Sequence, residues 1–382
     1  GVDASEKIFP MKATADEVVP SVTQYPVKAE DRFGNYIFAD DLSKLQGDNI
    51  AEIELLDDVT LGADAMLSTP VVVPAGRTVT LDLNGKKLST TVKSGSELET
   101  RHYYAVDNYG TFTLTDTRGG GLIVARGIEN LGNGIMTIED GTIEACDSNG
   151  GAAIWNEADL TINGGMLIAS SSEATPNYGA GCLNNSGTAT ITAGVFDGKS
   201  PRTYAIISTG DITITPAAGK KVVVSGVHGG LGIDSGTAVV NGGSYSSTDY
   251  YGLYVSNDGV GVDPETAAVT VNGGTFCGKR YSVWIGSDYN NPVNSTIKIN
   301  DGNFNQPLNA QENTREGAIV ITGGYFTGDP TAYLADGKAT LPSNKPGYTF
   351  MVDDKAATTV KPATGTPAVT IPDTIPEDKR EA

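Results

Sequence analysis

Short segments in which apolar and polar residues alternate recur along most of the chain. Each reads apolar-x-apolar-x-x-Gly-x-apolar, as in LTINGGML from Leu160 and VTVNGGTF from Val269. Alternation with a period of two predicts a β-strand with one buried face, and the glycines predict a sharp turn after it. The second apolar position recurs every 22 to 31 residues, at Ile138, Ile162, Ile191, Ile214, Val240, Val271, Ile299 and Ile321.

A second apolar strand precedes each of these segments. Its inward column is predicted to be Val106, Ile128, Trp155, Leu183, Ile207, Ile233, Val255 and Ile285. Repeats of this length with two or three short strands match one coil of a parallel β-helix, whose equivalent strands pair about 4.8 Å apart. A β-propeller needs four strands and roughly 40 or more residues per repeat. We therefore predict an all-β chain that folds as one right-handed parallel β-helix, a solenoid.

Aromatic residues close several repeats and are expected to stack as a ladder in the core. They are Phe196, Tyr245, Phe276, Phe304 and Phe326.

The two ends of the helix need covers, because an open end exposes unpaired strand edges. A short N-terminal capping helix is predicted over 39–46, and residues 331–352 are predicted to close the other end. The β-helix domain with its caps is placed at 36–360. Residues 1–35 stay unassigned, and the Pro- and Thr-rich run 361–382 is typical of a linker or tail.

Composition narrows the possible partners of this fold. The 382 residues carry a formal charge of −20, which argues against nucleic acid and anionic lipid as partners. The sequence contains no stretch of about 18 consecutive apolar residues, so it predicts no transmembrane helix. Two histidines and three cysteines exclude zinc fingers and a disulfide framework. Abundant Gly, Thr and Asn with little Cys is typical of an exported bacterial protein, secreted or at the cell surface.

Three stretches resemble a known group, the right-handed parallel β-helix surface proteins of gut and other bacteria described as adhesin-like or pectin-lyase-like. They are LLDDVTLG from Leu55 with TVTLDLNGKKL from Thr78, the Gly-Gly-x-Phe corners of the repeats, and GYF from Gly324 with YLADG from Tyr333. The resemblance covers roughly 36–352. It implies the β-helix fold, which hosts both enzymes and binding proteins.

The likeness to pectin lyases raises the question of an enzyme. Lyases on this fold hold calcium with carboxylates on neighbouring coils, and glycosidases need two facing carboxylates. The predicted outward face of the better-defined strand is a Thr and Asn ladder with one acid, Glu139. On the other strand Asp107 and Glu129 fall on successive coils and form a weak candidate calcium site; the alternative is two solvated acids. The sequence predicts no other cofactor, and the lack of a carboxylate cluster favours a non-catalytic protein over an enzyme.

The strongest binding signal is a pair of aromatics on successive coils. Tyr254 and Trp284 are predicted to point outward from the second strand. Two long loops, 256–268 and 286–296, follow them and carry Asp258, Asp263, Asp288 and Tyr289. Exposed aromatics beside acids and amides are a common way to grip sugar rings. The alternatives are a strand phase shifted by one residue, which buries both rings, and loops that are tolerated insertions.

The sequence thus predicts a secreted or cell-surface, non-catalytic protein that uses one lateral face for adhesion or for binding a polysaccharide or cell-surface glycan. The alternatives are a polysaccharide lyase or glycoside hydrolase, and a passive structural spacer.

Overall fold

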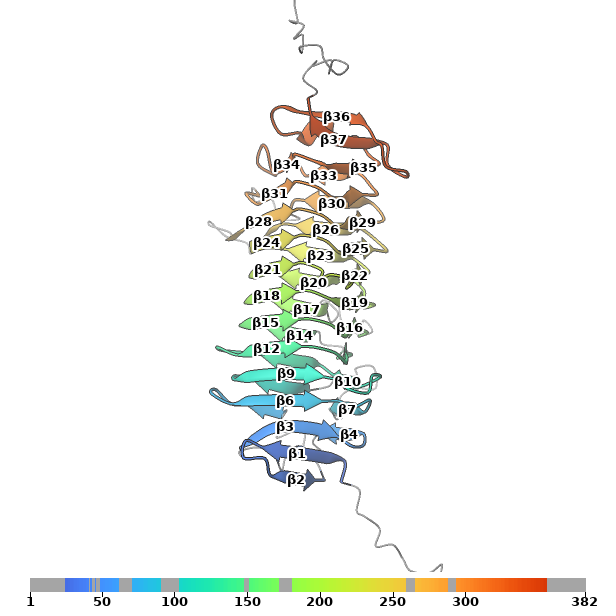
Figure 1. Ribbon diagram of the computed structural model, residues 1–382. Helices are drawn as coiled ribbons and strands as arrows, with labels where there is room; N and C mark the ends of the chain where they lie inside the picture. The colour runs from blue at the N-terminus through green and yellow to red at the C-terminus, as the bar shows by residue number, and fades with distance from the viewer. Residues whose placement is uncertain are drawn as a thin grey trace, which may run out of the picture.

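The computed structural model describes residues 25–40, 42, 45, 49–61, 71–90, 103–147, 151–171, 181–258, 265–287 and 293–355. Within these residues the chain winds into a rod of stacked coils, with its N-terminal coils at one end and its C-terminal coils at the other (Figure 1). The rod is a parallel β-solenoid of about nine turns, which confirms the predicted β-helix.

The described strands form three long sheets. Sheet A contains β1 (Val27–Asp31), β2 (Tyr36–Ala39), β3 (Ile50–Leu55), β6 (Thr78–Asp82), β9 (Thr111–Thr115), β12 (Ile135–Ile138), β15 (Asp159–Ile162), β18 (Thr188–Ile191), β21 (Asp211–Ile214), β24 (Gly236–Val240), β27 (Asn257–Asp258), β28 (Glu265–Val271), β31 (Thr296–Ile299) and β34 (Ile319–Ile321). Sheet B contains β4 (Val59–Leu61), β7 (Lys87–Thr90), β10 (Leu122–Ala125), β13 (Thr142–Ala145), β16 (Met166–Ala169), β19 (Gly194–Gly198), β22 (Val222–Gly226), β25 (Ser244–Ser247), β29 (Thr275–Cys277), β32 (Asn303–Phe304), β35 (Gly324–Phe326), β36 (Lys338–Pro342) and β37 (Phe350–Asp354). Sheet C contains β5 (Val71–Val73), β8 (Tyr104–Asn108), β11 (Gly127–Asn130), β14 (Ala152–Asn156), β17 (Gly181–Asn185), β20 (Tyr204–Ser208), β23 (Gly229–Ile233), β26 (Tyr251–Val255), β30 (Tyr281–Ile285) and β33 (Leu308–Ala310).

Each coil contributes one strand to sheet A, then one to sheet B, then one to sheet C. Strands of neighbouring coils pair in parallel, and the repeat anchors meet in register, as Ile138 does with Ile162. Because equivalent positions pair, side chains of the same kind stack in columns along the rod.

An aromatic column fills the core behind sheet B. The rings of Tyr245, Phe276, Phe304 and Phe326 stack in series, with centroids 4.8 to 5.2 Å apart and planes within 12°. The predicted ladder is thus confirmed over four coils. Phe196 is also buried, but Val224 of β22 lies between it and Tyr245 in the register, so the ladder does not reach it.

A buried amide column runs inside the corner between sheets C and A. Asn108 donates to Asn130, Asn130 to Asn156, and Asn156 to Asn185, at 2.7 to 2.8 Å. Asn185 continues the column by donating to the Ser208 hydroxyl at 2.9 Å. Each amide also donates to backbone carbonyls of the corner, so these fully buried polar side chains have partners.

Glycine is required at the corner between sheets A and B. Gly165 has a φ of 81°, and a Cβ placed on it would lie 2.6 Å from the carbonyl oxygen of Gly141. The corner therefore needs both the left-handed conformation and the missing side chain. This explains why the repeat keeps a glycine before its last apolar residue.

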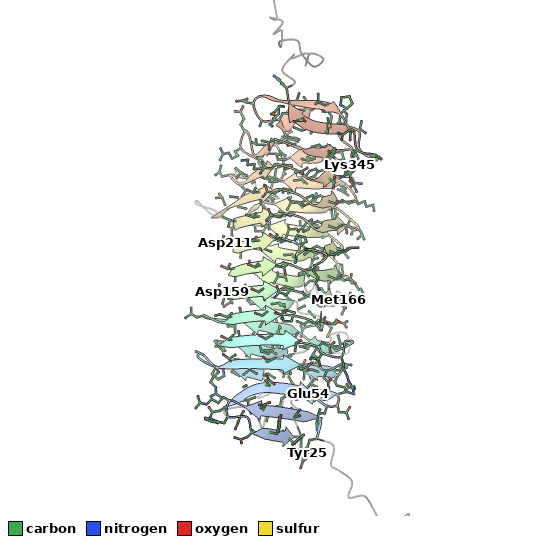
Figure 2. All side chains as sticks on the ribbon, viewed as in Figure 1. Tyr25, Glu54, Asp159, Met166, Asp211 and Lys345 are labelled. Atoms are coloured by element: carbon green, nitrogen blue, oxygen red, sulfur yellow. The ribbon has the colours of Figure 1, made fainter. Side chains whose placement is uncertain are left out.

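Antiparallel strands cover both ends of the rod. At the N-terminal end β1 pairs with β2 and β3, and Lys28 forms a salt bridge of 3.1 Å with Glu54 (Figure 2). Ala39 ends strand β2, Asp40 is an exposed residue of the bend that follows, and Leu42 and Leu45 are buried. Residues 41, 43, 44 and 46 of the predicted capping helix lie outside the described residues.

At the C-terminal end a 3₁₀ turn, η2 (Thr331–Tyr333), leads to the hairpin β36–β37, and β37 pairs antiparallel with β35. Lys345, in the hairpin loop, lies 4.9 Å from the Tyr325 ring centroid and donates to Asn303 (Figure 2). The predicted closure over 331–352 is confirmed. Residues 361–382 lie outside the described residues.

The amide column predicts that the same substitution at two adjacent residues, Asn185 and Asn184, changes stability to very different extents. Asn185→Asp replaces a donor that serves Ser208 Oγ and two backbone carbonyls with a buried charge, so we expect a loss of about 3 kcal/mol in unfolding free energy. Asn184→Asp, on the outward face of the same strand, is the matched control and should change stability by less than about 0.5 kcal/mol. Urea titrations compare them, and equal losses would contradict the ladder.

Candidate functional site

Sheet C has an unusual order of inward and outward residues. In a typical five-residue strand the second, third and fifth residues are buried, and the first and fourth face outward. The prediction assumed strict alternation and was partly wrong. Trp155 and Ile207 face outward rather than inward. Strict alternation also places the residues just before the predicted inward column on the outward face, whereas Ala105, Ile154, Cys182 and Ile206, which hold that position, are buried.

The reason lies at the corner where the chain leaves sheet B. The second residue of each sheet C strand packs against the end of the preceding sheet B strand, as Ala205 does beneath Gly198. The third residue then enters the core. Small residues at the second position, such as Ala153, Cys182 and Gly252, are the sequence signal of this arrangement.

Tyr254 and Trp284 occupy the outward fourth position of β26 and β30. They pair in the register, their ring centroids lie 5.1 Å apart, and their planes differ by 10°. The predicted adjacency of the two rings is therefore confirmed. Trp284 is 8 % exposed and Tyr254 is half-buried, so the tyrosine presents the more accessible ring.

These two rings belong to a larger surface, which we call the aromatic strip. Tyrosines at the first position of the same strands extend it: Tyr251 stacks on Trp284 with centroids 5.1 Å apart, and Tyr281 lies 6.4 Å from Tyr251. The strip lies on and beside strands β20, β23, β26 and β30, which stack on successive coils (Figure 1). It comprises Tyr204, His228, Tyr250, Tyr251, Tyr254, Tyr281 and Trp284. The sequence prediction missed five of these. The spacing Tyr-x-x-aromatic in YGLY and YSVW marks two of them, Tyr251 and Tyr281.

Glycines in β23 make room for the strip to continue across that coil. A Cβ on Gly229 would lie 2.2 Å from the Tyr204 ring, and one on Gly232 would lie 3.1 Å from it. The Tyr204 ring therefore leans over β23 and reaches Tyr254, two coils away, with centroids 5.0 Å apart. Without those glycines the ring series would be interrupted.

Tyr254 and Trp284 stack with an offset rather than directly face to face. Parallel rings in contact are separated by about 3.5 Å perpendicular to their planes, whereas the Tyr254 and Trp284 centroids are 5.1 Å apart. The offset along the ring plane is therefore about 4 Å, the arrangement that aromatic pairs prefer. The half-buried rings of Tyr251, Tyr254 and Tyr281 keep part of their surface accessible to a ligand, whereas Trp284 is almost covered.

One edge of the strip lies at the corner between sheets B and C. His228 packs against Tyr250 with centroids 4.4 Å apart, and the Arg280 guanidinium lies 4.5 Å from the Tyr250 ring centroid. At the opposite edge the amide oxygen of Gln311 accepts from the backbone N–H of Ser287. Polar groups thus flank the rings on both sides.

The predicted loop residues of this site are only partly described. Asp258 lies in β27, which pairs antiparallel with the start of β28, and its side chain lies outside the described residues. Asp263, Asp288 and Tyr289 also lie outside them. Their predicted place above the aromatic pair stays a prediction.

Asp107 and Glu129 lie on adjacent strands of sheet C, directly opposite each other in the register. Burial and the hydrogen bond to Asp107 raise the pKa of Glu129 to about 8, and burial also raises the pKa of Asp107. Asp107 Oδ1 is buried and accepts no hydrogen bond among the described residues. The pair therefore shares a proton at neutral pH, which disfavours calcium because calcium prefers ionised carboxylates.

Across the described part of the chain, no group of three or more His, Cys, Asp or Glu side chains is arranged to hold a metal ion.

The outward face of sheet A is polar. Side-chain amides and hydroxyls form a second ladder there: Asn300 donates to Asn272, and Asn272 donates to Asn241. Asp159 and Asp211 also lie on this face (Figure 2), and Asp211 accepts from the Thr237 hydroxyl. These groups satisfy one another, as the predicted Thr and Asn ladder implied.

Comparison with protein-family models, curated proteins and solved structures finds no match to this chain. The residues of the solenoid itself define its class, a parallel β-solenoid with an aromatic lateral face. In the described ranges, no helix has the length and apolar character needed to cross a membrane.

The shared proton predicts a pH-dependent stability. The pKa of Glu129 rises from 4.5 in the unfolded chain to about 8 in the folded chain. At pH values between these two, the folded chain keeps a proton on Glu129 that the unfolded chain has lost. The unfolding free energy contributed by this group falls as the pH rises through that window. Melting temperatures at several pH values should decline less steeply for Glu129→Gln than for the wild type.

Glu139→Gln, which removes an exposed acid from the edge of sheet A, is the control and should follow the wild-type slope. Parallel slopes for wild type and Glu129→Gln would show that Glu129 is ionised in the folded chain.

Proposed function

We propose that this chain is a non-catalytic binding protein, secreted or held at a bacterial cell surface, that adheres to a glycan through the aromatic strip. The observation that carries the proposal is the continuous series of ring contacts across the coils from β20 to β30, in which half-buried tyrosines surround the nearly covered Trp284. A pyranose ring has a C–H face that packs on an aromatic face and hydroxyls at its rim that need polar partners. Half-buried tyrosine rings flanked by polar groups meet both needs.

The rigid scaffold supports the same proposal. The rings stand on strands whose inward residues are fixed in the core, so little conformational entropy is lost when a ligand binds. The resemblance of the coil motifs to adhesin-like surface proteins is consistent with this role and with the proposed location.

An enzyme is the second candidate, and the Asp107–Glu129 pair is the observation that bears on it. The two residues lie directly opposite each other on paired strands of sheet C. In glycosidases the catalytic carboxyls stand about 5 to 9.5 Å apart, with the scissile bond between them. Strands of neighbouring coils are about 4.8 Å apart, so these side chains stand side by side on one face rather than on two sides of a bound sugar, which favours binding over hydrolysis.

A glycan array probed with labelled protein tests the proposal. Tyr254→Ala removes an accessible ring, and we expect it to weaken a bound glycan about fivefold to tenfold. Tyr109→Ala is the control, since Tyr109 is 43 % exposed and lies on β8's following turn, away from the strip. Loss of binding in the first variant alone supports the strip as the site.

Binding that survives Tyr254→Ala and Tyr251→Ala would place the ligand elsewhere. Silence across a broad array would favour the passive spacer. Release of unsaturated uronic products or new reducing ends would favour the lyase or hydrolase.

A further inference from the structure

The edge of the aromatic strip at the corner between sheets B and C is cationic, although the chain as a whole carries −20. Arg202 lies two residues before Tyr204, and Lys279 and Arg280 lie directly before Tyr281. All three side chains are exposed. The strip therefore borders a local positive charge.

Few described acids lie beside Lys279 and Arg280 at this edge. Lys199 and Asp197 form a salt bridge of 3.5 Å and neutralise each other. Asp249, beside Tyr250, is the one acid near Lys279 and Arg280 among the described residues of the turns that precede β26 and β30. At the opposite edge of the strip Asp234 follows β23. The pair of exposed cations at the first edge, Lys279 and Arg280, favours a ligand with anionic groups on that side.

Arg280 is held in a position suited to such a ligand. Its guanidinium lies 4.5 Å from the Tyr250 ring centroid, and the Tyr250 ring lies 5.6 Å from the Tyr251 ring. A guanidinium stacked on a ring keeps its N–H donors in its own plane, where they reach a carboxylate or sulfate in a two-pronged hydrogen bond. The cation thus lies beside the rings that would carry the sugar.

We propose that the ligand is an anionic, extended saccharide that lies along the solenoid axis, with its carboxylate or sulfate groups facing Arg280 and its neighbours. This inference rests on the proposed glycan binding and names its chemical class. Successive coils are about 4.8 Å apart, so the four coils of the strip span roughly 14 Å, the length of about three linked pyranose rings. Ring stacking fixes the chain, and the cationic edge fixes its orientation.

Three linear oligosaccharides of equal length test the inference by titration calorimetry: an oligomer of a hexuronic acid, its carboxyl-reduced neutral form, and a sulfated derivative of that neutral form. We expect at least one anionic form to bind about tenfold more tightly than the neutral one, and the two anionic forms separate carboxylate from sulfate recognition. Raising the salt from about 50 mM to about 500 mM should remove most of the difference.

The double variant Arg280→Gln/Lys279→Gln should bind all three forms with affinities within about threefold of one another. Lys298→Gln, which removes an exposed cation from sheet A, is the control and should keep the anionic preference. Equal affinity of the wild type for neutral and anionic forms would overturn the inference and leave glycan binding intact. An anionic preference that survives the double variant would also overturn it. No binding of any form, with a silent array, would overturn both proposals.

Discussion

In-register pairing of equivalent residues on successive coils is the interaction on which the rest of this structure depends. No single coil can bury its own apolar face, so each coil is stable only against its neighbours. Register then turns a repeated residue into a column: stacked rings behind sheet B, and amides at the corner of sheets C and A. The same rule places Tyr254 beside Trp284 on the outer face.

The buried amide column makes that register specific. An apolar column tolerates small displacements, whereas a chain of side-chain and backbone hydrogen bonds has one arrangement in which all donors are satisfied. The column ends at Ser208, and from β23 onward the same strand position holds Ile233, Val255 and Ile285. The aromatic strip is built largely over this second half, so its rings stand on coils fixed by apolar packing and by the stacked Phe column.

The period of the apolar residues was enough to predict the solenoid, because stacking demands the same pattern in each coil. The outward face of sheet C was harder to predict. Two consecutive buried residues break the alternation there, so Trp155 and Ile207 were assigned inward and Ile154 and Ile206 outward. The full strip also depends on rings that lean across coils. Tyr204 reaches Tyr254 over the glycines of β23, a contact that no local pattern in the sequence reveals.

The chain has two tryptophans, one inside the strip and one outside it, and their fluorescence tests the central claim most directly. Trp284 lies among the rings of the strip, whereas Trp155 faces outward from β14 and donates to Glu157. When an oligosaccharide that the protein binds is titrated into Trp155→Phe, the fluorescence reports on Trp284 alone. In Trp284→Phe the fluorescence reports on Trp155 alone. The account predicts a saturable emission change in the first variant and none in the second. A change confined to Trp155 would contradict it.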